Sequence, residues 1–101
     1  MNCKEIIEAN RDLQIQTLQD LVSIKSVVSN PVTNENGEYF PFGQGVQDAF
    51  ACFLKTAEAF GFETKNVDNY GGHVDFGNGD YRKGEPIVAV LGHLDVVPEG
   101  D

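Results

Sequence analysis

A run of five apolar residues at positions 87–91, Ile-Val-Ala-Val-Leu, is the feature that most constrains the fold of this chain. A short run that is apolar at every position is typical of a central strand covered on both faces of a sheet. The run leads through Gly92 to His93 and Asp95, and Pro98 closes the following turn. Because residues two apart in an extended segment face the same way, we expect the two polar side chains to lie together at the strand end.

The spacing of apolar residues predicts two helices ahead of that strand. The first covers residues 4–22, and its apolar stripe shifts sideways, which predicts a bent or loosely packed first half. The second helix has one continuous apolar face and stops at Gly61, a residue suited to a left-handed helix end. The apolar face of this second helix comprises Val46, Ala49, Phe50, Phe53, Leu54, Ala57 and Phe60.

The segments around the second helix complete an α/β pattern. Residues 29–37 have the composition of a loop, whereas residues 62–67 and 72–76 are predicted strands, the latter bracketed by glycine-rich turns that favour a hairpin. We therefore expect an α/β fold in which N-terminal helices precede the start of a mixed sheet. In open α/β sheets, ligands bind at the carboxyl ends of strands, which is where His93 lies.

Charge and hydropathy exclude several classes of function. The chain has a net charge of −9, and its seven Lys and Arg residues form no stripe, which argues against nucleic acid as a partner. No stretch approaches the roughly 20 apolar residues needed to span a bilayer, so no membrane partner is expected. The first residues are charged and lack the apolar core of a signal peptide, which favours a cytoplasmic protein. Cys3 and Cys52 are expected to be reduced thiols, and Cys52 lies on the second helix beside its apolar face.

Two His-x-Asp pairs compete as candidate sites. His73 and Asp75 have the same spacing as His93 and Asp95, but glycines flank them and no long apolar strand precedes them. We interpret His73 as a surface or cross-strand residue and His93 as the functional one. Imidazole and carboxylate ligands suit zinc, and also manganese or cobalt. One His and one Asp do not complete a catalytic zinc site, which usually has three protein ligands and a water.

Residues 92–98, Gly-His-Leu-Asp-Val-Val-Pro, resemble the first metal-binding motif of the di-zinc exopeptidases. That superfamily includes glutamate carboxypeptidases, aminoacylases and succinyl-diaminopimelate desuccinylases. Residues 21–27 resemble its opening helix end, except that Lys25 stands where proline is common. Residues 40–50 and 69–77 resemble the bacterial Xaa-His, or carnosinase-like, dipeptidase branch. The resemblance extends over essentially the whole chain.

The resemblance implies a dinuclear metal centre in an intact enzyme. It gives His93 the role of ligand to one of two divalent metal ions, with zinc favoured over manganese or cobalt. It makes Asp95 the catalytic-site carboxylate that holds and polarises that imidazole. The remaining ligands and the general-base glutamate would follow Asp101 in sequence. Residues 1–101 would then be the N-terminal part of an α/β/α catalytic domain, without the rest of that domain or the lid domain.

The expected activity is metal-dependent hydrolysis of a dipeptide amide bond in the intact protein, with residues 1–101 alone inactive. A deacylase or desuccinylase of the same superfamily is an alternative. A third interpretation is an α/β binding module with a surface His-Asp pair and no catalysis. Since the predicted strand at 87–91 lacks its later neighbours, we also expect self-association through exposed strand edges.

Overall fold

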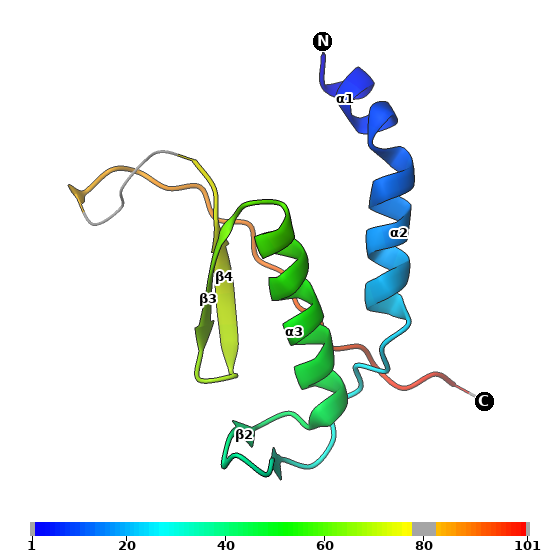
Figure 1. The fold of residues 1–101 in the computed structure, drawn as a ribbon, viewed down its shortest axis with the longest axis vertical. Coiled ribbons are helices and arrows are strands. Elements are labelled where there is room, and N and C mark those ends of the chain that lie inside the picture. Colours follow the sequence, from blue (N-terminus) through cyan, green and yellow to red (C-terminus); the bar gives the residue numbers. More distant parts are fainter. Residues whose placement is uncertain (1, 78–82, 101) are drawn as a thin grey trace.

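The computed structural model describes residues 2–77 and 83–100 of the chain. Its elements, in order, are α1 (Cys3–Ala9), α2 (Arg11–Val22), β1 (Val32–Thr33), β2 (Tyr39–Phe40), α3 (Gln44–Ala59), β3 (Glu63–Val67) and β4 (Gly71–Asp75). The α/β fold class is therefore confirmed, with helices beside small antiparallel sheets (Figure 1). No helix in this described part has the length and apolar character required to cross a membrane.

The first predicted helix is divided at Asn10 into α1 and α2. At the start of α1, the Asn2 side chain accepts the Glu5 backbone N–H at 2.9 Å, and the Glu5 carboxylate accepts the Asn2 N–H at 3.3 Å. At its end, the Asn10 side-chain amide donates to the Ile6 carbonyl at 2.9 Å, which satisfies a terminal acceptor. The break at Asn10 confirms the predicted bend and explains why the apolar stripe changes face.

Helix α3 is the central element, and its predicted extent is confirmed. It lies between α2 on one side and the β3–β4 hairpin on the other (Figure 1). Its buried residues Ala49, Phe50 and Ala57 belong to the predicted apolar face. The helix ends at Ala59 with Phe60 as its C-cap, and Gly61 follows with a φ of +89°, the left-handed conformation that glycine adopts without strain.

The two predicted strands after α3 form an antiparallel hairpin, as expected. Its register places Lys65 opposite His73 and Thr64 opposite Val74. The expectation that residues 29–37 are only a loop is wrong at residues 32–33, since β1 pairs there with β2.

A side chain that bonds to its neighbours' backbone organises the turn between β1 and β2. The Asn34 side-chain oxygen accepts the backbone N–H groups of Asn36 at 3.0 Å and Glu38 at 2.9 Å. The turn brings Phe40 of β2 into the core, where it is buried. The Asn34 side chain thus stabilises a turn in a segment that has the composition of an irregular loop.

The expectation of a central strand at residues 87–91 is wrong for this structure. These residues form no strand, and Val88 and Val90 are 96% and 94% exposed. The physical reason is the lack of a neighbour, because no segment of residues 2–77 or 83–100 pairs with them and a strand is held by cross-strand hydrogen bonds. Parallel pairing begins only later, at an isolated bridge between Val27 and Val96.

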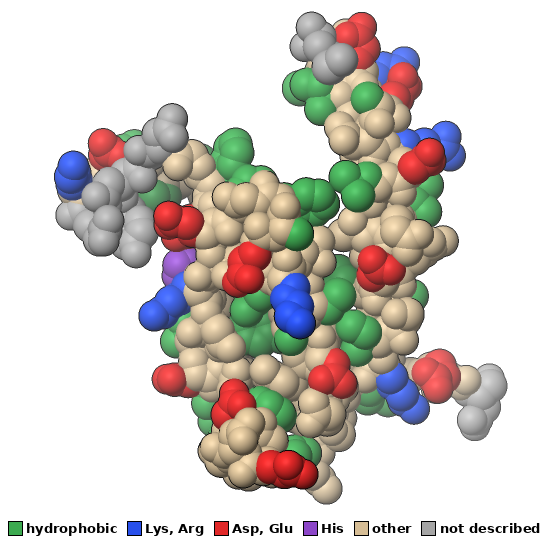
Figure 2. All heavy atoms as spheres, in the orientation of Figure 1, with side chains coloured by type: hydrophobic (Ala, Val, Ile, Leu, Met, Phe, Trp, Pro, Cys, Tyr) green, Lys and Arg blue, Asp and Glu red, His purple; other side chains and the backbone are tan. Residues whose placement is uncertain are grey.

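The buried core is small, and many apolar side chains reach the surface. Figure 2 shows them along the boundary between α2 and α3. Leu18 and Val22 of α2 are among the exposed ones, as is Phe60 at the end of α3. Both cysteines are free thiols, Cys3 exposed and Cys52 half-buried.

Candidate metal centre

His93 and Asp95 lie side by side on an extended segment that passes the N-terminal half of α3. The His93 Nδ1 is 3.2 Å from the Asp95 Oδ1 and 2.9 Å from the Asp95 backbone oxygen. Both oxygens are acceptors when the carboxylate is ionised, so the Nδ1 carries the proton that they share. In the neutral ring, the Nε2 then has a free lone pair, and the ring is 81% exposed. One nitrogen of His93 is therefore oriented by Asp95, and the other is available to a ligand.

The second pair, His73 and Asp75, has a similar arrangement on β4. Its Nδ1–Oδ1 distance is 2.7 Å, and both side chains are about half exposed. His73 lies opposite Lys65 in the hairpin, which agrees with its interpretation as a surface, cross-strand residue. The strand that was expected to distinguish His93 from His73 is not formed, so the His–Asp geometry alone does not separate the two pairs.

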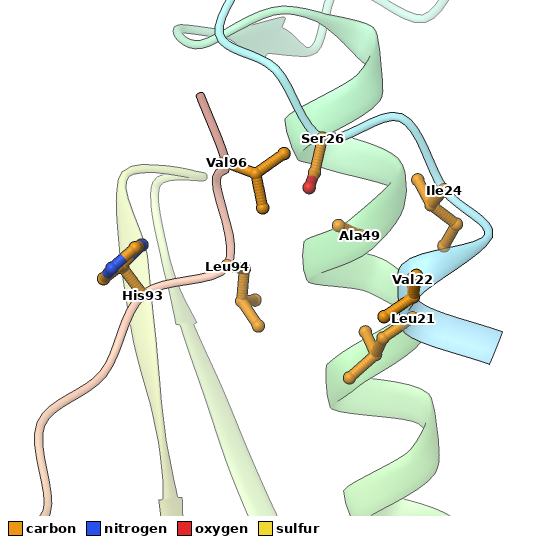
Figure 3. A pocket seen from close by; sticks show the side chains of 8 residues that line it. All are labelled: Leu21, Val22, Ile24, Ser26, Ala49, His93, Leu94 and Val96. Atoms are coloured by element: carbon orange, nitrogen blue, oxygen red, sulfur yellow. The ribbon is translucent and has the colours of Figure 1, made fainter. Parts of the chain in front are cut away.

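The surroundings of His93 supply the distinction instead. A pocket of about 280 Å³ lies between the end of α2, α3 and the 93–96 segment (Figure 3). His93 is at its rim, on the other side of the segment from Leu94, which points toward α3. The residues that line the pocket are Leu21, Val22, Ile24, Ser26, Ala49, His93, Leu94 and Val96. The His93 ring thus borders a mostly apolar hollow, whereas a pocket of similar size beside β4 is lined by Val74 and not by His73.

A backbone hydrogen bond attaches the segment that carries His93 and Asp95 to the chain that follows α2. The Val96 N–H donates to the Ser26 carbonyl at 3.0 Å, directly after Asp95 in sequence. Ser26 is the buried polar residue of the described core, with 4% of its surface exposed. Sequence reasoning missed it, and the one signal for it is a small uncharged polar residue between Lys25 and the Val-Val pair at 27–28.

His93 and Asp95 fit one part of a metal centre. They supply a nitrogen donor with a free lone pair and a carboxylate beside the other ring nitrogen, the usual support of a metal-bound imidazole. Within residues 2–77 and 83–100, however, no three His, Cys, Asp or Glu side chains come together in a way that could hold a metal ion. A complete coordination shell would need additional ligands.

Comparison with known sequences connects the chain with a class of bacterial hydrolases. No family model matches it. The chain is instead similar, over nearly its whole length, to proteins named dipeptidases. The resemblance inferred from its motifs is confirmed to this extent, while the di-zinc superfamily stays a prediction.

Among these relatives is the beta-Ala-Xaa dipeptidase of Lactobacillus delbrueckii subsp. lactis. It is 43% identical over 101 residues, which are 100% of this chain and 20% of that protein. The Bacillus subtilis protein YtjP, provisionally named a dipeptidase, is 39% identical over 97 residues, or 96% of this chain and 19% of that protein. A Staphylococcus aureus protein with a similar provisional name is 33% identical over 98 residues, which are 97% of this chain and 19% of its own length. The chain spans about a fifth of the length of these relatives.

Proposed function

We propose that this chain is the N-terminal part of the catalytic domain of a metal-dependent dipeptidase. The observation that carries the proposal is the His93–Asp95 pair, whose Nδ1 is held at 3.2 Å from Oδ1 while Nε2 is free, in a chain similar throughout to named dipeptidases. The proposed substrate is a dipeptide of the Xaa-His or carnosine type. The name of the Lactobacillus relative, which specifies a β-alanyl residue, supports this choice.

In this proposal, His93 binds one of two divalent metal ions through Nε2, with zinc favoured over manganese or cobalt. Asp95 is the positioning residue, because its carboxylate Oδ1 and its backbone oxygen both accept from the Nδ1–H and so orient the ring. When bound, such a metal pair lowers the pKa of a shared water and polarises the scissile carbonyl. The mostly apolar pocket lies on the α3 side of the 93–96 segment, whereas the His93 ring itself is 81% exposed.

The proposal assigns the remaining ligands and the general base to polypeptide outside residues 1–101. The relatives are about five times as long as this chain, which leaves ample sequence for those groups. Residues 1–101 alone are expected to be inactive. A cytoplasmic location stays part of the same prediction.

The test uses a longer protein that contains this chain. The protein is dialysed against a chelator and assayed on a β-alanyl-histidine dipeptide and on an N-succinyl amino acid, before and after zinc or manganese is added back. Loss and metal-dependent recovery of dipeptide hydrolysis support the proposal. Recovery only on the N-acylated substrate favours a deacylase instead. No hydrolysis of either substrate at any metal concentration contradicts a catalytic role and favours a binding module.

Two matched variants locate the site within that assay. His93→Ala is expected to abolish the metal-dependent hydrolysis, because it removes the proposed ligand nitrogen. His73→Ala is the control, since it removes the same kind of side chain from an equally spaced His-x-Asp pair. Equal losses in the two variants would contradict the assignment to His93.

A further inference from the structure

Residues 25–29 lie between the start of α3 and the 93–96 segment that carries the proposed site. On one side, the Ser26 carbonyl accepts the Val96 N–H at 3.0 Å, and Val27 forms the parallel bridge with Val96. On the other side, the Ser29 N–H donates to the Phe42 carbonyl at 3.0 Å, just before α3 begins. The position of the site segment is therefore linked to the way in which residues 25–29 pack on α3.

A glycine in the first turn of α3 makes that packing close. A side-chain carbon built on Gly45 would overlap the Lys25 carbonyl oxygen and lie 3.2 Å from the Lys25 carbonyl carbon. Both atoms belong to the backbone, so a larger residue at position 45 displaces the chain at Lys25 and Ser26 rather than a flexible side-chain end. The Ser26 carbonyl, which holds Val96, follows directly after this contact.

We infer that Gly45 is a positioning residue for the His93–Asp95 pair. Its missing side chain lets the Lys25–Ser26 backbone lie against α3, and from there the Ser26 carbonyl holds the amide that follows Asp95. The inference rests on the proposed function for the role of His93, whereas the link from Gly45 to Val96 is a matter of geometry. A displacement at Gly45 should therefore alter the His93 pair and leave the His73 pair on the hairpin unchanged.

The test compares Gly45→Ala with Gly71→Ala in the ¹⁵N-labelled 101-residue chain. Gly71 is the matched control, because a side-chain carbon added there meets no atom within 4 Å. Two quantities are measured by NMR at fixed pH: the hydrogen-exchange rate of the Val96 amide, and the tautomer of each histidine from ring-nitrogen shifts. In Gly45→Ala, the Val96 amide is expected to exchange about tenfold faster, because the loss of one hydrogen bond lowers its protection by about that factor. His93 is expected to lose its preference for the Nδ1–H tautomer.

His73 is the internal control for a general loss of structure. If its tautomer is unchanged in Gly45→Ala while that of His93 changes, the effect is specific and supports the inference. Unchanged Val96 exchange and an unchanged His93 tautomer would overturn it, as would equal changes at both histidines in a chain that keeps its α3 signals.

A second variant decides the matter if Gly45→Ala fails to fold. Val96→Pro removes the donor N–H without changing a residue of α3. Loss of the His93 tautomer preference, with His73 as in the wild type, supports positioning through the Ser26–Val96 bond, and its retention overturns it. These readouts are independent of catalysis, so a failed dipeptidase assay in the longer protein would refute the proposed function without deciding this inference.

Discussion

The His93 Nδ1 lies within hydrogen-bonding distance of both the carboxylate and the backbone oxygen of Asp95, at 3.2 and 2.9 Å. Two acceptors from one residue thus converge on a single ring nitrogen. The backbone oxygen fixes the tautomer even where the carboxylate is exchanged for a neutral group. Of the two acceptors, only the carboxylate carries a negative charge that can stabilise positive charge on the ring. The two contributions are separable by substitution at position 95.

Asp95→Asn is expected to lower metal-dependent dipeptide hydrolysis in the longer protein by about 10- to 100-fold, the usual effect of losing the carboxylate behind a metal-bound histidine. The asparagine keeps the backbone acceptor and the shape of the side chain, so the His93 ring stays in place and loses only its charged partner. The measurement is kcat and metal affinity on the same dipeptide. Asp75→Asn is the control, because it makes the same change in the other pair.

Equal activity of Asp95→Asn and the wild type would show that the carboxylate does not act through His93. A comparable fall in Asp75→Asn would show that the loss reflects surface charge rather than the proposed site.

Much of the fold could be predicted because its signals are local. The apolar face around Phe50 and the stop at Gly61 define α3, and the two glycines at the start of β4 help to define the hairpin. The sideways shift of the apolar stripe in the first predicted helix indicates the break at Asn10. Residues 87–91 gave an equally strong local signal, but their strand requires partners from elsewhere, and pairing is not a local property.

The site shows the same division between local and distant information. The spacing of His93 and Asp95 predicted that they lie together, because an extended segment has a period of two. That spacing could not rank them above His73 and Asp75, which make an even shorter contact. Two features separate the pairs: His93 itself lines a pocket, whereas His73 does not line the one beside β4, and the Ser26–Val96 bond follows Asp95 directly. Both features join segments about 70 residues apart and become visible only in the folded chain.

Gly72→Ala is expected to destabilise the packing of the hairpin on α3 by about 1–3 kcal/mol, the usual cost of overpacking. A side-chain carbon there would overlap the Lys65 carbonyl oxygen and lie 2.9 Å from the Phe50 Cζ. Phe50 is buried and cannot move away without opening the core. The measurement is the free energy of unfolding in urea, followed by circular dichroism at low protein concentration.

Gly71→Ala is the neighbouring control, with open space around the added carbon and an expected change of about 0.5 kcal/mol or less. If the two variants unfold at the same urea concentration, the close contact between Gly72 and Phe50 does not hold the hairpin on the helix.

The 101-residue chain is expected to self-associate through residues 87–91. This segment is exposed and has no charged side chain, so two antiparallel copies would place no like charges opposite each other. The net charge of −9 makes two copies repel each other, and added salt screens this repulsion, so it should increase the mass measured by light scattering. Val90→Lys should restore the monomer mass at low salt, because it places two positive charges within the paired segment of a dimer.

Ile7→Lys is the control that distinguishes strand pairing at residues 87–91 from association through any exposed apolar surface. Ile7 is also an exposed apolar residue, with 57% of its surface accessible, but it lies on α1, where no strand edge is available. Self-association that survives Ile7→Lys and disappears in Val90→Lys locates the contact at residues 87–91. Equal suppression by both lysines would instead show that total exposed apolar surface, rather than an unpaired strand, drives the association. A wild-type chain that stays monomeric at high salt would exclude both explanations.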